Sequence, residues 1–221
     1  MVDINRYLFD LCQLLKSNFG ERLVYVGLQG SYLRGEATDH SDIDIMAVID
    51  GLTAEDLKQY RAIIDHLPYS DHSCGFICSK DDLAAWNPLE ICNLLHSTRD
   101  YYGVLSDIIP TYCVDDVRNF VKMSLNNIYH EICHRYIHGS TEKNVEALPY
   151  TYKGVFFILQ NLHWLRSGHF PNSRAELLPL LSDKDKLVLK QSMMLSAGDP
   201  YDFPESFQLL FTWCQEALQS L

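Results

Sequence analysis

The segment from Gly27 to Ile45 reads Gly27-Leu28-Gln29-Gly30-Ser31-Tyr32-Leu33-Arg34-Gly35 and, after five intervening residues, Ser41-Asp42-Ile43-Asp44-Ile45. An apolar run at residues 23–28 enters it and another at residues 43–49 leaves it, which predicts two strands joined by a polar turn. Gly30 has no Cβ, so its backbone can approach a ligand closely and adopt angles that other residues avoid. Ser31 offers a hydroxyl and an amide at a predicted helix start, a location that suits phosphate.

Two carboxylates follow the turn. Asp42 and Asp44 are two residues apart on a predicted strand, so both point to the same face, and Ile43 and Ile45 point to the other. Neighbouring carboxylates repel each other unless a cation lies between them, and Mg²⁺ prefers oxygen ligands of this kind. The segment therefore predicts a site for phosphate and a divalent metal.

In this order and spacing, Gly30-Ser31, Gly35 and Ser41-Asp42-Ile43-Asp44 resemble the signature of the nucleotidyltransferase superfamily typified by DNA polymerase β. The likeness is to the branch of aminoglycoside nucleotidyltransferases and minimal nucleotidyltransferase antitoxins. It implies an α+β fold, with a small mixed β-sheet nucleotidyltransferase domain that has helices on one face, followed by a helical bundle domain. The alternative is a glycine-containing hairpin and an Asp-bearing turn with no ligand.

The resemblance also implies the site. Asp42 and Asp44 are the expected catalytic and metal-binding residues, with Mg²⁺ as cofactor and a nucleoside triphosphate, ATP first, as substrate. The expected nucleotide-binding residues are Gly30, Ser31, Arg34, Ser41 and Lys153. Arg34 alternatively pairs with Glu36, and Lys153 alternatively is a solvated lysine at a helix end.

Composition narrows the class of partner. The chain of 221 residues has 18 Lys and Arg against 29 Asp and Glu, a net charge of −11. With no basic cluster, we expect no nucleic-acid partner and rather a cationic small substrate. Seven cysteines without a framework spacing indicate reduced thiols. We also find no signal peptide and no apolar run long enough to span a membrane, and so expect a soluble, cytoplasmic protein.

The pattern divides the chain into residues 1–110, the nucleotidyltransferase domain, and residues 111–221, a helical bundle expected to bind the acceptor. The first part is predicted to contain helices at 4–19, 53–66, 83–86 and 88–98 and strands at 23–28, 43–49, 72–79 and 101–104. The second is predicted to contain a helix capped by Asp115 or Asp116 and ended by Gly139. A central apolar helix opened by Pro149 and ended by Gly168 follows, then helices that begin near Ser173, Ser182 and Asp202.

One rival motif lies in the second half. His130-Glu131-Ile132-Cys133-His134 matches the H-E-x-x-H zinc-hydrolase pattern, and His138 lies one turn further along. The alternatives are a polar helix face, or a contact face with the first domain or with a second subunit in a homodimer. Cys74 and Cys78 are too far apart on a strand for one zinc ion, and we expect both to be core thiols.

The predicted third strand contains no acid, although superfamily members usually place a third carboxylate there. Asp71 precedes it, and Glu131 and Glu146 in the helical half are other candidates for a catalytic base. The sequence thus predicts a Mg²⁺-dependent nucleotidyltransferase that moves a nucleoside monophosphate to a hydroxyl of an unidentified small molecule or protein. The alternative is a catalytically weak nucleotide-binding regulatory or antitoxin-type protein.

Overall fold

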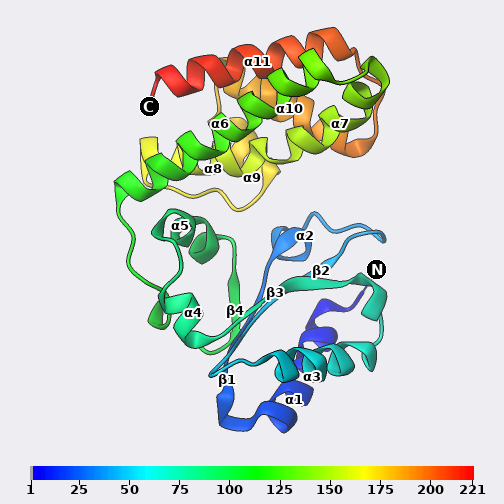
Figure 1. Ribbon diagram of the computed structural model, residues 1–221, viewed down its shortest axis with the longest axis vertical. Helices are drawn as coiled ribbons and strands as arrows, with labels where there is room; N and C mark the ends of the chain where they lie inside the picture. The colour runs from blue at the N-terminus through cyan, green and yellow to red at the C-terminus, as the bar shows by residue number, and fades with distance from the viewer. Residues whose placement is uncertain (1) are drawn as a thin grey trace. The chain divides into compact units, whose positions relative to one another are not determined.

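A computed structural model describes residues 2–221 (Figure 1). The chain forms two compact units, which divide between Tyr112 and Cys113. We call them the sheet unit and the helical unit. The division falls two residues beyond the predicted boundary after residue 110.

The sheet unit is built on four strands in the order β3-β2-β1-β4. Their bounds are β1 Leu23–Leu28, β2 Ile43–Ile49, β3 Ser73–Cys78 and β4 Arg99–Tyr102. Strand β1 pairs antiparallel with β2 and β4, whereas β2 and β3 are parallel. The sheet is therefore mixed, as predicted. Strand β4 begins two residues earlier than expected.

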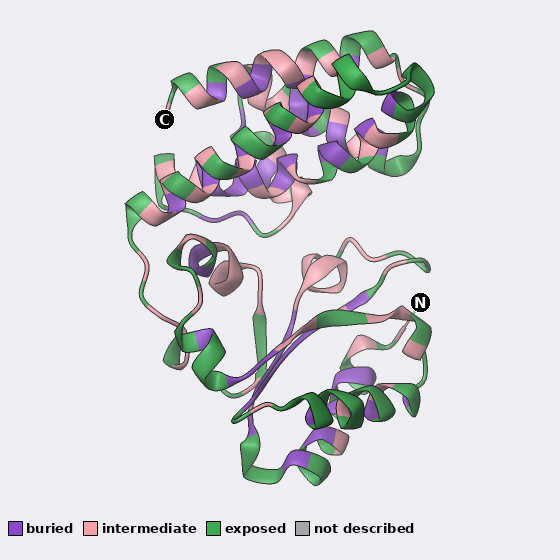
Figure 2. Cartoon of the chain, in the orientation of Figure 1, coloured by how far each residue is buried: buried purple, intermediate pink, exposed green. Residues whose placement is uncertain are grey.

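Helices α1 and α3 cover one face of this sheet. The helices of the unit are α1 Ile4–Phe19, α2 Gly30–Arg34, α3 Ala54–Asp65, α4 Lys80–Ala84 and α5 Pro88–His96, and its 3-10 turns are η1 Gly20–Arg22, η2 Ser70–His72 and η3 Leu105–Asp107. Leu8, Leu11 and Leu15 of α1 pack with Ile43 and Ile45 of β2 in one buried cluster (Figure 2). The buried side chains therefore recur about every 3.6 residues on the helix and every second residue on the strand, so both elements could be predicted from sequence.

The opposite face of the sheet carries a smaller cluster. Met46 and Val48 of β2 pack there with Tyr25, Leu83 of α4 and Leu105 of η3. The prediction of helices on one face holds for α1 and α3, and it did not include this second cover by short segments.

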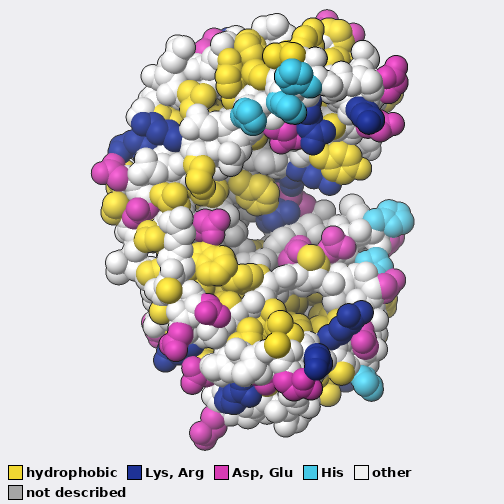
Figure 3. All heavy atoms as spheres, in the orientation of Figure 1, with side chains coloured by type: hydrophobic (Ala, Val, Ile, Leu, Met, Phe, Trp, Pro, Cys, Tyr) yellow, Lys and Arg dark blue, Asp and Glu magenta, His cyan; other side chains and the backbone are white. Residues whose placement is uncertain are grey.

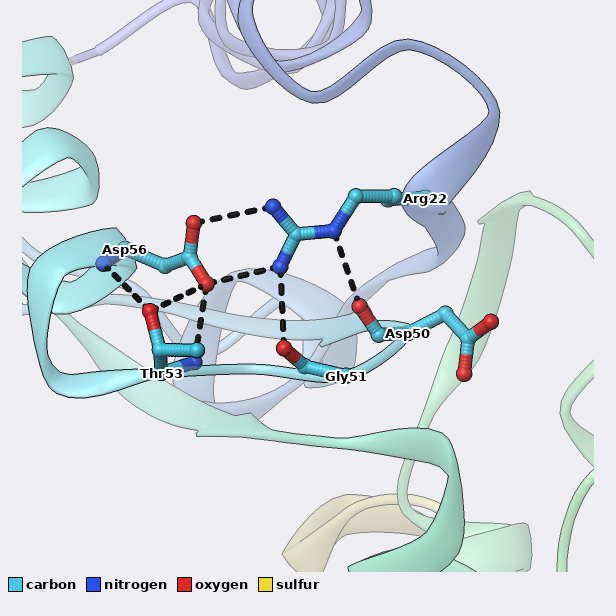
Figure 4. A network of polar contacts seen from close by, with 5 residues as sticks. All are labelled: Arg22, Asp50, Gly51, Thr53 and Asp56. Atoms are coloured by element: carbon cyan, nitrogen blue, oxygen red, sulfur yellow. Dashed lines mark hydrogen bonds and ion pairs between the residues drawn. The ribbon is translucent and has the colours of Figure 1, made fainter.

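A polar network ties the start of α3 to the end of η1 (Figure 4). The Arg22 guanidinium donates to both carboxylate oxygens of Asp56, at 3.0 and 2.7 Å, and to the carbonyls of Asp50 and Gly51, each at 3.0 Å. Asp56 also accepts from the amide of Thr53 at 2.8 Å, completing a capping box. These bonds hold the pKa of Asp56 well below its usual range, because the Arg22 and Thr53 hydrogen bonds favour the charged form.

The helical unit consists of six α-helices among its described residues. They are α6 Val114–His138, α7 Thr141–Lys153, α8 Val155–Ser167, α9 Arg174–Leu177, α10 Asp183–Ala197 and α11 Phe203–Gln219, with a 3-10 turn, η4 Leu178–Leu180, after α9. Val155, Phe156, Ile158, Leu159 and Leu162 of α8 are all buried. Helix α8 is thus the central helix, and the predicted α+β fold class with a helical second half is confirmed.

The prediction that Pro149 opens the central helix is wrong. Pro149 lies inside α7, and the helices divide at Gly154. A proline inside a helix has no N–H for the carbonyl four residues earlier, which here belongs to Val145. The hydroxyl of Tyr201 donates to that carbonyl instead. A tertiary contact therefore supplies the hydrogen bond that the local sequence cannot.

The predicted cap of α6 also needs correction. Cys113 is the N-cap, and Asp116 acts from the third helical position, where its carboxylate accepts from the Cys113 amide at 2.7 Å. The cap is reciprocal in the manner of a capping box, so the acid stands three residues inside the helix rather than before it.

Two further findings concern the chain as a whole. All seven cysteines are free thiols. Among residues 2–221, none of the helices combines the length and the apolarity that a membrane crossing needs.

Candidate active site

The predicted site residues of the sheet unit lie around the turn between β1 and β2. The Gln29 amide donates to the Asp44 carbonyl at 2.8 Å, which extends the β1–β2 pairing by one step. Helix α2 begins directly afterwards and ends at Gly35, whose φ of 69° is left-handed. The Glu36 amide then donates to the Ser31 carbonyl at 2.9 Å. The chain thus leaves one strand, makes a short helix and returns to the adjacent strand.

Gly30 is in direct contact with Asp44. A Cβ added at Gly30 would lie 1.8 Å from Oδ2 of Asp44, and the φ of Gly30 is +67°. Only glycine satisfies both conditions, because any side chain would overlap the carboxylate and would also strain the backbone. The glycine and the second acid of the motif therefore form one packed pair.

The two carboxylates differ in their surroundings. Asp42 is exposed and immediately precedes β2, whereas Asp44 is half-buried within it. Burial raises the pKa of Asp44 above its ordinary range, and the neighbouring Asp42 carboxylate raises it further. Ile43 and Ile45 are buried against α1, as the alternation predicted. Crowded carboxylates of this kind fit a divalent cation with oxygen ligands, because its charge would offset both their repulsion and their desolvation.

Strand β3 brings a thiol to Asp44. Cys74 lies opposite Asp44 in the parallel β2–β3 register, and its thiol partly offsets the effect of burial by lowering the pKa of Asp44. The prediction that Cys74 is a core thiol is wrong because it is exposed, while Cys78 is buried as expected. No sequence pattern marked Cys74 as a neighbour of the acids, since the β2–β3 register that places it there depends on tertiary pairing.

The candidate bases are spread over the chain. Asp71 lies in η2 at the entrance of β3, with its side chain 82% exposed and 3.8 Å from Nε2 of His72. Glu131 is paired with Arg135 at 3.0 Å and accepts from the Thr151 hydroxyl at 3.1 Å. Glu146 is exposed. In the structure as described, the thiol of Cys74, rather than a carboxylate, is the β3 side chain next to Asp44.

The remaining predicted nucleotide-binding residues of the sheet unit have local partners. Arg34 pairs with Glu36, Nε to Oε2 at 3.0 Å, which is the alternative considered for it. The Ser41 hydroxyl accepts from the Thr38 amide at 2.9 Å and so holds the turn before Asp42. Ser31 is half-buried in the first turn of α2. The turn is thus ordered by its own side chains.

Lys153 is the last residue of α7 in the helical unit. Its side chain is exposed, and its ammonium lies 5.0 Å from the centroid of the Tyr150 ring. This cation–π contact orients the lysine. Its role toward a triphosphate stays a prediction.

The zinc-hydrolase pattern is only partly supported by its geometry. His130, His134 and His138 are exposed along α6, and Glu131 has the two partners named above. Within residues 2–221, no three His, Cys, Asp or Glu side chains are grouped so as to hold a metal ion. A hydrolytic site of this class needs a third protein ligand beside the two histidines, and the described residues place none there.

A cavity of about 300 Å³ borders β3 in the sheet unit. Its lining includes the hydroxyl-bearing side chains Tyr7, Tyr60 and Ser73, together with Ile45 and Cys74. The same strand that contacts Asp44 therefore borders a cavity in the size range of small-molecule sites.

Comparison with known proteins assigns a class to this arrangement. Residues 10–72 match the family model of the nucleotidyltransferase domain. A candidate protein adenylyltransferase of Methanocaldococcus jannaschii is 31% identical over 62 residues, which cover 28% of this chain and 42% of that relative's length. A crystal structure of the spectinomycin adenyltransferase AAD(9) from Enterococcus faecialis, with ATP and spectinomycin, shares the fold with a TM-score of 0.60 and 12% identity. That match covers 97% of this chain and 99% of the other.

Residues 10–72 are therefore similar to nucleotidyltransferase domains, as the motif predicted, and the fold of the chain is that of a known adenyltransferase. The matched residues run from α1 to η2, so they include the turn, both aspartates and the α3 cap. The similarity that extends over the helical unit is one of fold.

Proposed function

We propose that the protein is a Mg²⁺-dependent nucleotidyltransferase that moves a nucleoside monophosphate, AMP first, from a triphosphate to an acceptor hydroxyl. The observation that carries the proposal is the packed pair of Gly30 and Asp44, with Asp42 two residues before it. At the β1–β2 turn, a backbone segment that carries no side chain at Gly30 therefore lies beside two carboxylates. The match of residues 10–72 to the nucleotidyltransferase domain supports the same assignment.

In this proposal Asp42 and Asp44 hold Mg²⁺. When bound, Mg²⁺ supplies charge neutralisation at the transferring phosphate and the leaving pyrophosphate. Gly30 and Ser31 offer their backbone to the phosphates, and the missing side chain of Gly30 keeps that approach open. Arg34, Ser41 and Lys153 are the further residues that we assign to nucleotide binding. Arg34 would serve the phosphates while paired with Glu36, as a partly neutralised cation.

The acceptor is a hydroxyl of a small molecule or of a protein. One of the proteins that this chain resembles is named for the adenylylation of proteins, and the other was crystallised with spectinomycin. The net charge of −11 favours a cationic acceptor. The seven free cysteines support a cytoplasmic location.

A second function is favoured by one observation. Cys74 lies next to Asp44 where superfamily members usually have a third carboxylate. A neutral thiol beside Asp44 does not take a proton from an acceptor as a carboxylate does. The alternative is therefore a protein that binds Mg²⁺ and nucleotide but turns over little, in a regulatory or antitoxin-type role.

The experiment that tests the proposal uses the purified full chain, Mg²⁺ and each nucleoside triphosphate labelled at the α-phosphate. Pyrophosphate release and transfer of label are measured with aminoglycosides and with cell-lysate proteins as acceptors. We expect transfer from ATP that Asp44→Asn abolishes. The matched control, Asp71→Asn, should lower turnover by less than about tenfold, equivalent to about 1.4 kcal/mol.

The outcomes separate the two functions. Nucleotide binding that needs Asp44, without pyrophosphate release for any acceptor, would favour the regulatory alternative. Loss of turnover by several orders of magnitude in Asp71→Asn would identify Asp71 as the missing third carboxylate. Absence of nucleotide binding by the intact protein would contradict both functions.

A further inference from the structure

The histidine face of α6 is not explained by the nucleotidyltransferase assignment. His130, His134 and His138 follow one another at intervals of four residues, so they lie along one side of the helix. All three are exposed, and histidine side chains gather on the surface over α6 (Figure 3). Imidazole is a good ligand for divalent transition metals, and two histidines four residues apart on a helix can bind one ion.

The ring distances distinguish the two neighbouring pairs. The ring centroids of His134 and His138 are 4.9 Å apart, and those of His130 and His134 are 6.0 Å apart. With a metal–nitrogen bond of about 2.05 Å, an imidazole centroid lies about 3.2 Å from the metal it binds. Two such rings at the angles of about 90–110° found in common coordination geometries have centroids about 4.5–5.2 Å apart. The His134–His138 pair already has this separation, whereas the other pair would need an angle of about 140°.

The location at the end of α6 also favours a cation. His138 is the last residue of this 25-residue helix, and the Gly139 amide donates to the Arg135 carbonyl at 2.7 Å to close it. The carbonyl end of a helix carries partial negative charge, which attracts positive charge within the last turn. The nearby Arg135 is paired with Glu131 at 3.0 Å, so its own charge is largely compensated. A net charge of −11 adds to the attraction for cations.

We propose that His134 and His138 form a surface binding site for one divalent transition metal ion of the Ni²⁺, Cu²⁺ and Zn²⁺ class. The two imidazoles supply two ligands, and the remaining coordination positions are open to solvent or to a group from another molecule. His130 is excluded as a third ligand of the same ion, because it lies about 12 Å along the helix axis from His138. This agrees with the lack of a three-residue metal group among residues 2–221.

The site is distinct from a zinc-hydrolase centre and does not rest on the proposed transferase function. A two-histidine site has fewer protein ligands than a structural zinc site, so it exchanges its metal readily. We therefore expect the purified protein to carry no stoichiometric zinc and to bind metal when it is added.

The test is a calorimetric titration of the full chain with Ni²⁺ in the presence of excess Mg²⁺, which occupies carboxylate sites. We expect one Ni²⁺ per chain, and a loss of affinity of at least about tenfold in His134→Gln and in His138→Gln. His130→Gln should stay within about twofold. The matched control outside α6 is His163→Gln, because the ring centroids of His163 and His169 are 5.9 Å apart, which is also too wide.

Nuclear magnetic resonance tests the proposal on the unsubstituted protein. Substoichiometric Cu²⁺, which is paramagnetic, should broaden the ring resonances of His134 and His138 before those of the other histidines. Unchanged Ni²⁺ affinity in His134→Gln and in His138→Gln would overturn the assignment. A loss of affinity in His130→Gln equal to that in His138→Gln would overturn it as well. Helical circular dichroism of each variant verifies that the exposed substitutions leave α6 folded.

Discussion

The sheet unit and the helical unit differ in how well local sequence patterns predict the bounds of their helices and strands. In the sheet unit, β1, β2 and α1 begin and end at the residues that local patterns predict. In the helical unit, the break between α7 and α8 lies at Gly154 although a proline at residue 149 suggested a start. Local sequence patterns are sufficient to predict two strands with alternating apolar residues that are joined by a turn. They fail where a distant side chain such as Tyr201 supplies a missing hydrogen bond.

The units also differ in what they reveal about function. The sheet unit contains the residues that match the nucleotidyltransferase domain, and in its candidate site Gly30 lies directly against the Asp44 carboxylate. The helical unit resembles a known adenyltransferase in fold, and that likeness does not identify an acceptor. The similarity to nucleotidyltransferase domains thus lies in one unit, whereas no short motif in either unit points to an acceptor.

The largest effect that we predict tests the specificity of the Gly30–Asp44 contact. Gly30→Ala should reduce Mg²⁺-dependent ATP affinity by more than about 100-fold, equivalent to about 2.8 kcal/mol, because the new methyl group displaces the Asp44 carboxylate. Gly35→Ala is the matched control. Gly35 has a similar φ of +69°, but nothing lies within 4 Å of an added Cβ. Equilibrium ATP binding, with and without Mg²⁺, measures both.

Gly35→Ala should lose stability of about 1–2 kcal/mol through backbone strain and retain ATP affinity within a few-fold. Equal loss of ATP binding in the two variants would mean that backbone strain in the turn, rather than the contact with Asp44, determines binding. ATP binding by the sheet unit would then not depend on a specific contact between two residues.

A second prediction compares the acid stability of the two units. The folded-state pKa of Asp56 is depressed by Arg22, so the stability that this carboxylate contributes is present above its ordinary pKa of about 4. It is lost progressively as the pH falls from there toward the folded-state pKa. Asp56→Asn should lower the Tm of the sheet unit by several degrees at neutral pH and flatten its dependence on pH below about 4.

The matched control is Glu55→Gln, because Glu55 lies on the same turn of α3 and forms an exposed salt bridge with Lys58 at 2.7 Å. Trp86 reports on the sheet unit, and Trp164 and Trp213 report on the helical unit. If Asp56→Asn left the acid transition of the Trp86 signal unchanged, the Arg22–Asp56 network would not stabilise this unit.

The smallest effect concerns the contact that local rules missed. Tyr201→Phe should destabilise the helical unit by about 0.5–1 kcal/mol, because the Val145 carbonyl loses its donor. In a Pro149→Ala background residue 149 regains an N–H for that carbonyl, so the same substitution should cost less. Denaturant unfolding of the four proteins gives the coupling energy. A coupling energy of zero would show that Tyr201 does not substitute for the missing helical hydrogen bond.

How much of the fold was predictable follows from these cases. Alternating strands, glycine turns and a capping box at Thr53 are local and were correctly predicted, as was the α+β class. The cover of the second sheet face by Leu83 and Leu105 was not predicted, because it depends on packing between distant segments. The cap at Cys113 is local, but the acid was expected at the cap position itself rather than three residues inside the helix.

The site was predictable to a similar extent. The proximity of Asp42, Asp44 and the Gly30 turn follows from strand alternation and one hairpin. That Cys74 lies beside Asp44 depends on the parallel register of β2 and β3, which connects residues thirty positions apart in sequence. The pairing of Arg34 with Glu36 was one of two open alternatives. Lys153 lies in the other unit, so its role could be suggested only by resemblance.

The central claim is that the turn after β1 and the two aspartates form one metal–nucleotide site. Its most direct test is calorimetric binding of ATP in the presence and absence of Mg²⁺ to the intact protein and to the Asp42→Asn, Asp44→Asn double variant. We predict Mg²⁺-dependent binding that the double variant loses while its circular dichroism and Tm remain close to those of the intact protein. Unchanged ATP affinity in the folded double variant would contradict the account.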